Sequence, residues 1–314
     1  MRRFLIDTDT GNDDVWALLC ALRATDRVEV EAITVVMGNV KLDYCVKNAL
    51  IAVERAGTYR PPVYRGMARA LLHERPYGAG EVHGRDGLSN MNLPWPETKP
   101  GGKHAMDAII DLVMANPGEI EIVTLGPLTN LAMAYLKEPR IAENVKKAYI
   151  MGGTGFDQGN ATPAGEFNIY VDAEAADVVL KSGMNMTWVT WDVCRGETPL
   201  SSADFDYIES AGTPLSQFAV RCTQSVRAYD RKKWGRDAVG IIDSIIMIAA
   251  LWPEVQKDVY RANCTIETKG ETSYGYFGID KSNMHPETGT KVEICSTVDA
   301  AAYKAHLFEL LRGL

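Results

Sequence analysis

One stretch near the N-terminus decides how the fold is interpreted: Phe4-Leu5-Ile6-Asp7-Thr8-Asp9-Thr10-Gly11-Asn12-Asp13-Asp14. Its apolar start predicts a buried strand, and the residues from Asp13 to Thr25 predict a helix. Four carboxylates therefore fall where a strand gives way to a helix, which is the edge at which open α/β sheets bind ligands. On the strand, Asp7 and Asp9 are two apart and share a face. Asp13 and its neighbour Asp14 diverge by about 100° on the helix, so the four cannot share one role.

Two interpretations compete for these aspartates. In the first, Asp9 caps the helix while Asp13 and Asp14 favour its positive N-terminus, which accounts for only one or two of the four. In the second, a hard divalent cation with oxygen ligands offsets the repulsion between four crowded like charges. We favour the cation. Zinc fits poorly, because the five histidines show no H-x-x-x-H spacing and no cysteine lies near the aspartates.

The rest of the chain predicts one α/β domain over residues 1–314. Short β-branched runs alternate with helical patterns through the first half, which indicates a Rossmann-like, mostly parallel central sheet with helices on both faces. A glycine- and proline-rich segment, residues 66–103, is typical of a binding loop. Helical patterns cover roughly Leu215 to Lys232. A small antiparallel C-terminal portion, interpreted as a meander, comprises Val259–Thr268, Ser273–Gly278 and Lys291–Cys295.

Composition excludes several classes of protein and partner. Hydrophobic residues at 46% and charged residues at 24% are typical of an ordinary folded chain rather than a disordered or collagen-like one. The net charge of −8 argues against a nucleic-acid partner, which needs clustered positive charge. No apolar run approaches the ~18 residues of a membrane span, so we expect no membrane partner. Six cysteines without close spacing predict reduced thiols, and an apolar run that Asp7 interrupts provides no export signal, so we expect a cytoplasmic location.

The pattern Asp7-x-Asp9-x-Gly11-x-Asp13-Asp14 resembles the N-terminal fingerprint of the inosine-uridine-preferring nucleoside hydrolase family. Members of that family cleave the N-glycosidic bond of ribonucleosides. Further segments resemble motifs of the same family and occur in the same order, which makes the likeness more specific than any single motif. These segments are Thr34–Asn39, His83-Gly84, Leu125–Asn130, Met151–Gly153, Asn160–Asn168 and Asp243.

The resemblance implies a site built around one Ca²⁺ ion. Its protein ligands would be the carboxylates of Asp9, Asp14 and Asp243 and the backbone carbonyl of Leu125. Calcium takes six to eight oxygen ligands, which leaves room for two ribose hydroxyls and a water. Asp9 would also be the general base that activates the metal-bound water.

A ribose-binding pocket and a mode of assembly follow from the same resemblance. The ribonucleoside substrate would be gripped by six side chains: Asp13, Asn39, His83, Asn160, Glu166 and Asn168. Amides and carboxylates together supply the donors and acceptors that sugar hydroxyls need. The family likeness also predicts a homodimer or homotetramer.

Ile242 is the main departure from the family pattern. Before the late aspartate, one branch of the family has a histidine that assists departure of the base, and another has a tryptophan. Proton donation contributes about 10² to 10⁴-fold to such reactions, and isoleucine has no proton to donate. Three explanations stay open: another side chain is the donor, the substrate carries a base that leaves readily or is activated by stacking, or the protein binds nucleosides with weak or no turnover.

Five side chains are candidates for the missing donor: His83, Arg227, Tyr229, Arg231 and Trp234. Each also has a plainer explanation. A loop histidine commonly serves as a hydrogen-bonding group. Tyr229 and Trp234 lie five apart on a predicted helix, which favours packing on two faces, and the i, i+4 pair of Arg227 and Arg231 is typical of a solvated face.

A different chemistry also fits the first motif. Asp7-Thr8-Asp9-Thr10 matches the first four positions of the D-x-D-x-T pattern of haloacid-dehalogenase-type phosphatases, in which Asp7 would attack phosphorus. That interpretation needs a later G-D-x-x-x-D pair, which Gly240-Ile-Ile-Asp243 does not supply. We therefore expect an enzyme that hydrolyses ribonucleosides to ribose and free base with calcium as its cofactor.

Overall fold

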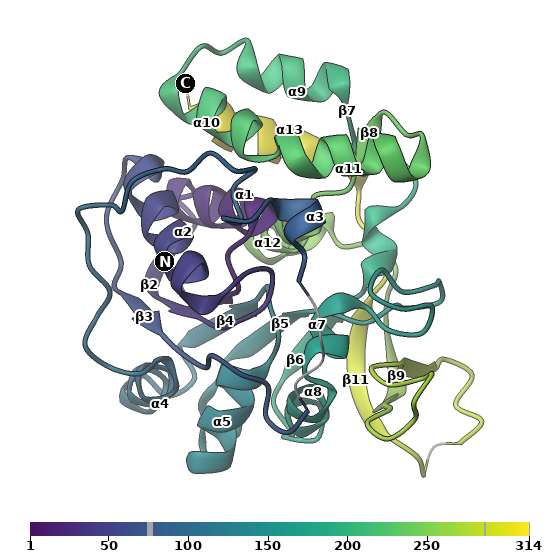
Figure 1. The fold of residues 1–314 in the computed structure, drawn as a ribbon. Helices are drawn as coiled ribbons and strands as arrows, with labels where there is room; N and C mark the ends of the chain where they lie inside the picture. Colours follow the sequence, from purple (N-terminus) through teal and green to yellow (C-terminus); the bar gives the residue numbers. More distant parts are fainter. Residues whose placement is uncertain (74–77, 286, 314) are drawn as a thin grey trace.

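A nine-stranded sheet forms the centre of the computed structural model, which describes residues 1–73, 78–285 and 287–313 (Figure 1). Within this sheet only β9 runs against its neighbours, and every other adjacent pair is parallel. In order across the sheet the strands are β10 (Phe277–Asp280), β9 (Val259–Ile266), β11 (Thr290–Cys295), β6 (Met186–Val189), β5 (Lys147–Met151), β4 (Ile120–Thr124), β1 (Arg2–Thr8), β2 (Val28–Val35) and β3 (Val63–Arg65).

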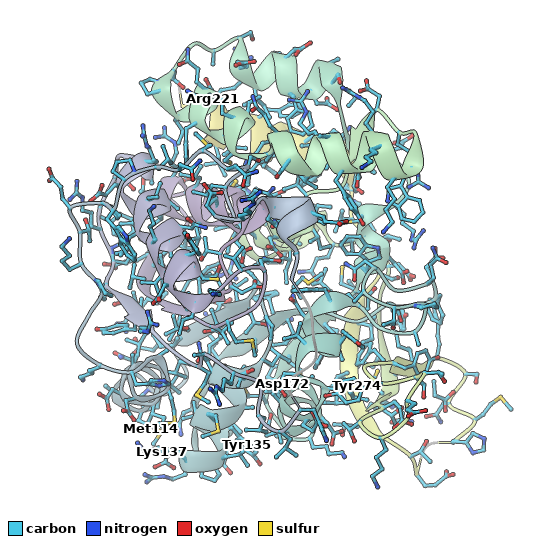
Figure 2. All side chains as sticks on the ribbon, viewed as in Figure 1. Met114, Tyr135, Lys137, Asp172, Arg221 and Tyr274 are labelled. Carbon is cyan, nitrogen blue, oxygen red and sulfur yellow. The ribbon has the colours of Figure 1, made fainter. Side chains whose placement is uncertain are left out.

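Helices cover both faces of the sheet, so the parallel strands are apolar on both sides. In β1, Phe4 and Ile6 point into one core, and Leu5 points into the other. The first core is closed by α1 (Asn12–Arg23), α2 (Leu42–Ala56), α10 (Pro214–Cys222), α12 (Ile242–Leu251) and α13 (Ala300–Arg312). The second is closed by α4 (Ala105–Ala115), α5 (Thr129–Lys137) and α8 (Ala173–Leu180), where Met114 and Tyr135 pack at its edge (Figure 2). The predicted fold class is confirmed.

The helical stretch predicted over Leu215–Lys232 consists of two helices. α10 ends at Cys222, and α11 (Gln224–Trp234) begins after Thr223. The Thr223 hydroxyl donates to the carbonyl of Val220, and the Ser89 hydroxyl donates to that of Cys222. These side-chain bonds take carbonyls that a continuous helix would use, so the axis breaks and α11 runs in its own direction (Figure 1).

The predicted C-terminal meander is wrong in its order. β11 pairs with the free side of β9 and joins it to the parallel strand β6. The strand predicted at Ser273–Gly278 begins only at Phe277, since Gly275 takes a positive φ of 79° and residues around it form turns. The antiparallel portion therefore extends the main sheet.

The remaining elements connect or flank these layers. They are α3 (Gly80–His83), α6 (Ile141–Asn144), α7 (Phe167–Val171), α9 (Ser202–Glu209), the short helices η1 (Trp191–Cys194) and η2 (Pro253–Val255), and a ribbon of β7 (Leu200–Ser201) and β8 (Ala238–Val239). In its described part, the predicted loop 66–103 is irregular apart from α3. All six cysteines are unpaired, and five are buried. Among the described residues, no helix has the length and apolarity that a membrane crossing requires.

The topology places a binding site at the ends of β1 and β4. The chain goes from β1 to β2 and β3 on one side, then returns to β4 on the other side of β1. Ligands bind at such a switch point because the loops that follow the two strands diverge there. The backbone N–H of Leu125 donates to the carbonyl of Asp7 at 2.8 Å, which holds the two strand ends together just below these loops.

Candidate active site

A cavity of about 880 Å³ opens at this edge of the sheet. All of the site residues predicted from the sequence except Asp9 and Asp14 line it: Asp13, Asn39, His83, Leu125, Asn160, Glu166, Asn168 and Asp243. Asp9 and Asp14 are buried directly behind a lining residue. The backbone N–H of Asn39 donates to Asp9 Oδ2 at 2.7 Å, and its side-chain amide donates to Asp14 Oδ2 at 3.1 Å.

Three carboxylates meet at the cavity wall. Asp13 and Asp14 from α1 and Asp243 from α12 each present an oxygen within 4.8 Å of the other two. Burial, and after it the neighbouring carboxylates, raise the pKa values of Asp243 and the adjacent Asp9 well above the usual range. Burial likewise raises the pKa of Asp13 to about 6. These residues therefore repel one another in the absence of a positive charge.

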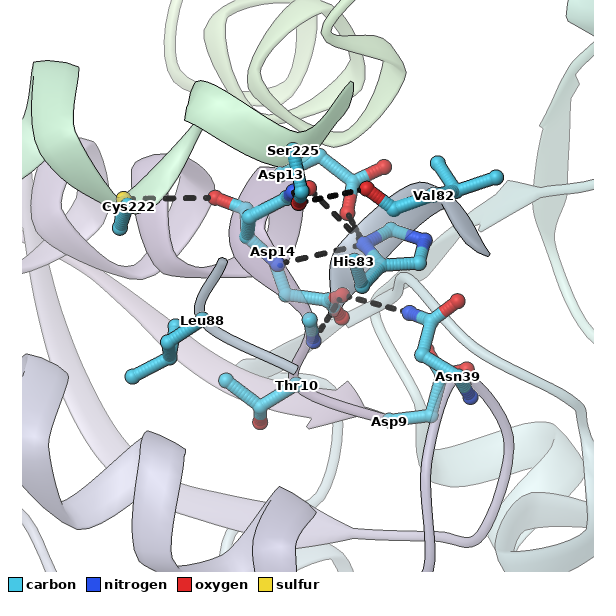
Figure 3. A network of polar contacts seen from close by, with 12 residues as sticks. Asp9, Thr10, Asp13, Asp14, Asn39, Val82, His83, Leu88, Cys222 and Ser225 are labelled. Carbon is cyan, nitrogen blue, oxygen red and sulfur yellow. Dashed lines mark hydrogen bonds and ion pairs between the residues drawn. The ribbon is translucent and has the colours of Figure 1, made fainter. Parts of the chain in front are cut away.

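Unpaired oxygens in this group fit a hard cation. Asp9 Oδ1 and Asp13 Oδ1 are buried and have no hydrogen-bond partner in the described residues. An unpaired buried carboxylate oxygen is costly, and an all-oxygen donor set suits calcium or magnesium. Capping explains only part of Asp14, whose Oδ2 accepts from the Gly11 N–H at 2.8 Å at the start of α1 (Figure 3).

Two glycines fix the position of Asp9. A Cβ added to Gly38 would lie 1.9 Å from Asp9 Oδ2, and one added to Gly126 would lie 2.6 Å from Asp9 Oδ1. Backbone from the loops after β2 and β4 therefore approaches the carboxylate as closely as a glycine allows. Because the Asn39 N–H anchors Oδ2, the free atom of Asp9 is Oδ1.

The polar residues on the opposite wall are held by the backbone. Glu166 accepts hydrogen bonds from the N–H groups of Gly153, Asn168 and Ile169 and thereby caps α7. The Asn168 amide donates to the Leu125 carbonyl at 2.6 Å. Asn160 Oδ1 accepts from the N–H of Phe167 at 2.8 Å. The arrangement presents oriented donors and acceptors to the cavity at little cost in side-chain entropy.

His83 is a neutral hydrogen-bonding group. Its Nδ1 lies 2.8 Å from Asn12 Oδ1 and 3.6 Å from Asp13 Oδ1 (Figure 3). Burial lowers the pKa of this imidazole to about 4, so it carries no spare proton near neutral pH. We conclude that His83 orients Asn12 and lines the pocket rather than replacing the histidine that the family likeness leads one to expect before Asp243.

Of the four other candidate proton donors, two line the cavity and two do not. Arg227 stacks over the Phe205 ring, and Arg231 pairs with Asp237 at 2.7 Å; neither lines the cavity. Tyr229 and Trp234 do line it, although the sequence favoured packing for both. The two residues lie on one helix, as predicted, but α11 runs along the cavity, so both side chains reach it.

Asp7 is unsuited to nucleophilic attack. It is fully buried, its Oδ1 accepts from the Thr34 hydroxyl and the Asn130 amide, and it does not line the cavity. The predicted shared face of Asp7 and Asp9 is wrong, since β1 ends at Thr8 and Asp9 already lies in the loop. This geometry removes the basis for the phosphatase alternative.

Residues 4–305 match the family model described as inosine-uridine preferring nucleoside hydrolase. The chain belongs to this family. The rice (Oryza sativa subsp. japonica) protein called probable uridine nucleosidase 2 is 35% identical, over 98% of this chain and 93% of that protein. The inosine-uridine preferring nucleoside hydrolase of Leishmania major is 31% identical, over 95% and 97%. A solved plant nucleoside hydrolase, the PpNRh1 enzyme, superposes with a TM-score of 0.94 at 31% identity and covers 100% of this chain and 99% of its own.

Family membership gives the site its chemistry. Nucleoside hydrolases hydrolyse the N-glycosidic bond of ribonucleosides, so this chain is an enzyme of that class. The family is metal-dependent, and the cluster of Asp13, Asp14 and Asp243 is a group of carboxylates that can hold a metal.

Sequence analysis missed part of the cavity wall. The missed residues include Gln158, Trp191, Cys194, Asp230, Lys233 and Arg236. Two of them, Asp230 and Lys233, lie on α11, a polar helix on which the sequence favours a solvated face for Arg227 and Arg231. The packing of α11 against α3, seen in the bond from the Ser225 hydroxyl to the Val82 carbonyl, turns one side of that helix into the cavity.

Proposed function

We propose that the enzyme hydrolyses ribonucleosides in a calcium-dependent reaction in which Asp9 is the general base toward the attacking water. One observation carries this proposal: a buried, unpaired Asp9 Oδ1 lies beside a cluster of carboxylates that face a cavity lined with sugar-binding groups. A general base needs a free acceptor atom at a fixed position, and this carboxylate offers one.

The proposed calcium ligands are the carboxylates of Asp9, Asp14 and Asp243 and the carbonyl of Leu125. Although the Leu125 carbonyl accepts from Asn168, its second lone pair is available. When bound, calcium supplies an anchor for vicinal ribose hydroxyls and a Lewis acid that makes water more acidic. Calcium is preferred to magnesium because the larger ion accepts more oxygen ligands in irregular geometry.

The protein residues carry out the remaining steps of the proposal. Asp9 Oδ1 accepts the proton of the attacking water, while the Asn39 N–H holds Oδ2 still. Asp13 accepts from a ribose hydroxyl, and the rest of the sugar contacts come from Asn39, His83, Asn160, Glu166 and Asn168. N-glycosidic cleavage develops positive charge on the sugar ring, which the surrounding carboxylates stabilise.

Ribose release from a panel of purine and pyrimidine ribonucleosides tests the proposal. The purified chain with calcium should form reducing sugar, lose this activity after chelation and regain it when calcium is restored. The matched 2′-deoxyribonucleosides should be poor substrates because they lack one of the two vicinal hydroxyls. Saturable nucleoside binding without any release of ribose would instead support the alternative of a binding protein.

Crowding at Gly38 predicts a strong effect of one methyl group. In Gly38→Ala the new Cβ must displace Asp9 Oδ2, which lies 1.9 Å from its ideal position. We expect kcat for ribose release to fall by ~10²-fold, since a misplacement of about 1 Å has effects of that order. Gly102→Ala is the matched control because a Cβ there meets nothing within 4 Å. Equal activity of the two variants would show that the position of Asp9 does not limit the reaction.

Calcium should stabilise the protein more at high pH. In the metal-free protein, burial raises the pKa of Asp13 from 3.8 to about 6. The folded state then binds more protons than the unfolded state, so the free energy of unfolding falls as pH rises through this interval. A cation offsets the ionised form of the cluster, so the calcium-induced rise in Tm should be larger at about pH 8 than at about pH 5. Scanning calorimetry of chelated and calcium-loaded protein measures both rises, and a larger rise at the lower pH would contradict the assignment.

Three further features stay predictions from the sequence and its family likeness. We expect a homodimer or homotetramer, which light scattering of the purified chain measures. We also expect a single domain over residues 1–314 and a cytoplasmic location.

A further inference from the structure

In the proposed binding mode the ribose contacts the carboxylates, which leaves the wall of the cavity away from the aspartate cluster for the base of the nucleoside. This wall combines one face of α11 with the segment that leads into α12. Ile242 lies on it immediately before Asp243 and is buried. An aliphatic side chain cannot protonate a departing base, so a side-chain proton donor has to be sought among the other residues of the wall.

Asp230 is an acidic residue of this wall without a partner. Its half-buried side chain lines the cavity, and within the described residues its carboxyl group forms no hydrogen bond and no ion pair. Nearby groups are engaged. The Tyr229 hydroxyl accepts from Lys233 Nζ at 2.5 Å, and the nearby Asp237 pairs with Arg231.

Asp230 lines the same cavity as the sugar-binding carboxylates. The Cys194 thiol, which also lines the cavity, lies within electrostatic reach of Asp13, Glu166 and Asp230. Asp13, Glu166 and Asp230 all line this one cavity, so a single bound nucleoside can contact the sugar-binding carboxylates and Asp230 together.

The charges around Asp230 are compatible with a protonated carboxyl group. Burial raises its pKa, and the cations of Arg236 and Lys233 oppose this without cancelling it. The nearby Cys194 thiol stays neutral because burial raises its pKa well above the usual value. A raised carboxyl pKa keeps more of the acid form available near neutral pH.

We propose that Asp230 is the catalytic residue that donates a proton to the departing base, and this inference rests on the proposed hydrolysis. As the C1′–N bond breaks, its electron pair stays with the base, and the Asp230 carboxyl proton moves to a ring nitrogen or exocyclic oxygen. Water bonds to C1′ and gives its proton to Asp9. Asp9 then releases that proton to solvent, and Asp230 takes one back, so a nucleoside and water yield ribose and a neutral base.

Substrates that differ only in the leaving group test this role. Inosine and uridine need protonation of the base, whereas 4-nitrophenyl β-D-ribofuranoside releases a stable phenolate without it. Asp230→Asn should lower kcat/KM for inosine and uridine by ~10²-fold or more and change that for the nitrophenyl riboside by less than ~3-fold. Asp237→Asn removes a neighbouring exposed carboxylate and should leave all three values unchanged.

Each other outcome has a definite meaning. Equal losses of Asp230→Asn on nucleosides and on the nitrophenyl riboside would assign a structural role to the residue and overturn the inference. Normal nucleoside turnover in Asp230→Asn, together with a nucleoside-selective loss in Tyr229→Phe, would transfer the role to the phenol. A wild-type chain that releases ribose from neither the nucleosides nor the nitrophenyl riboside with calcium present would refute the proposed hydrolysis, and the inference with it.

Discussion

Replacing Asp9 with asparagine is expected to lower kcat for ribose release by ~10³-fold or more, because in the proposed mechanism this side chain is both the proton acceptor and a metal ligand. Asparagine keeps the size of aspartate and can still accept from the Asn39 N–H, so the fold should persist. Steady-state ribose release at saturating calcium measures the effect, and circular dichroism checks the fold.

Asp7→Asn is the matched control for this experiment. Asp7 is a second buried aspartate two positions away, but it bonds to Thr34 and Asn130 outside the cavity. We expect Asp7→Asn to change stability and leave kcat within ~10-fold of the wild type. If Asp9→Asn kept near-normal turnover, or if Asp7→Asn abolished it, the assignment of the base would be wrong.

The second large effect is expected at Asp243, where loss of function should accompany a gain in metal-free stability. Burial and the charges of Asp14, Asp13 and Asp9 raise the pKa of Asp243, which means that its ionised form is unfavourable without a cation. A neutral asparagine removes that repulsion. Asp243→Asn should therefore raise the Tm of the chelated protein at about pH 8, by an amount worth on the order of 1 kcal/mol.

The same variant should lose the response to calcium. We expect the calcium-induced rise in Tm to disappear and kcat/KM to fall by ~10²-fold or more, because one of three carboxylate ligands is gone. Scanning calorimetry with and without calcium, followed by ribose release, measures both effects. A variant that kept the full calcium-induced rise, or whose chelated form were less stable than the chelated wild type, would separate Asp243 from the metal site.

Local chemistry made the centre of the site predictable from sequence. An apolar run followed by Asp9, Asp13 and Asp14 requires a buried strand and a helix start, and parallel strands collect such ends at one edge. The arrival of Asp243 from far along the chain followed only from the family likeness, since no local pattern links it to β1. The structure brings it within 4.8 Å of Asp13 and Asp14.

The features that sequence analysis missed depend on contacts between distant segments. At the break between α10 and α11, the Ser89 hydroxyl donates a hydrogen bond to the Cys222 carbonyl. Ser89 lies in a distant loop, so the periodicity of residues 215–232 cannot predict this contact. The order of β9, β10 and β11 depends on the edge of β9 with which β11 pairs. The alternation of apolar and polar residues within one strand does not specify that edge. Asp230 has no local sequence signal, and only the packing of α11 against α3 brings it to the cavity wall.

Titration calorimetry of Ca²⁺ into the chelated chain tests the central claim most directly. The account predicts one calcium ion per chain in the wild type and none in Asp243→Asn. It also predicts that ribose, added to the chelated wild type, binds only after calcium is restored, because the vicinal hydroxyls and the aspartates share one ion. A chain that bound no calcium, yet took up ribose and released it from nucleosides at an unchanged rate, would contradict the account.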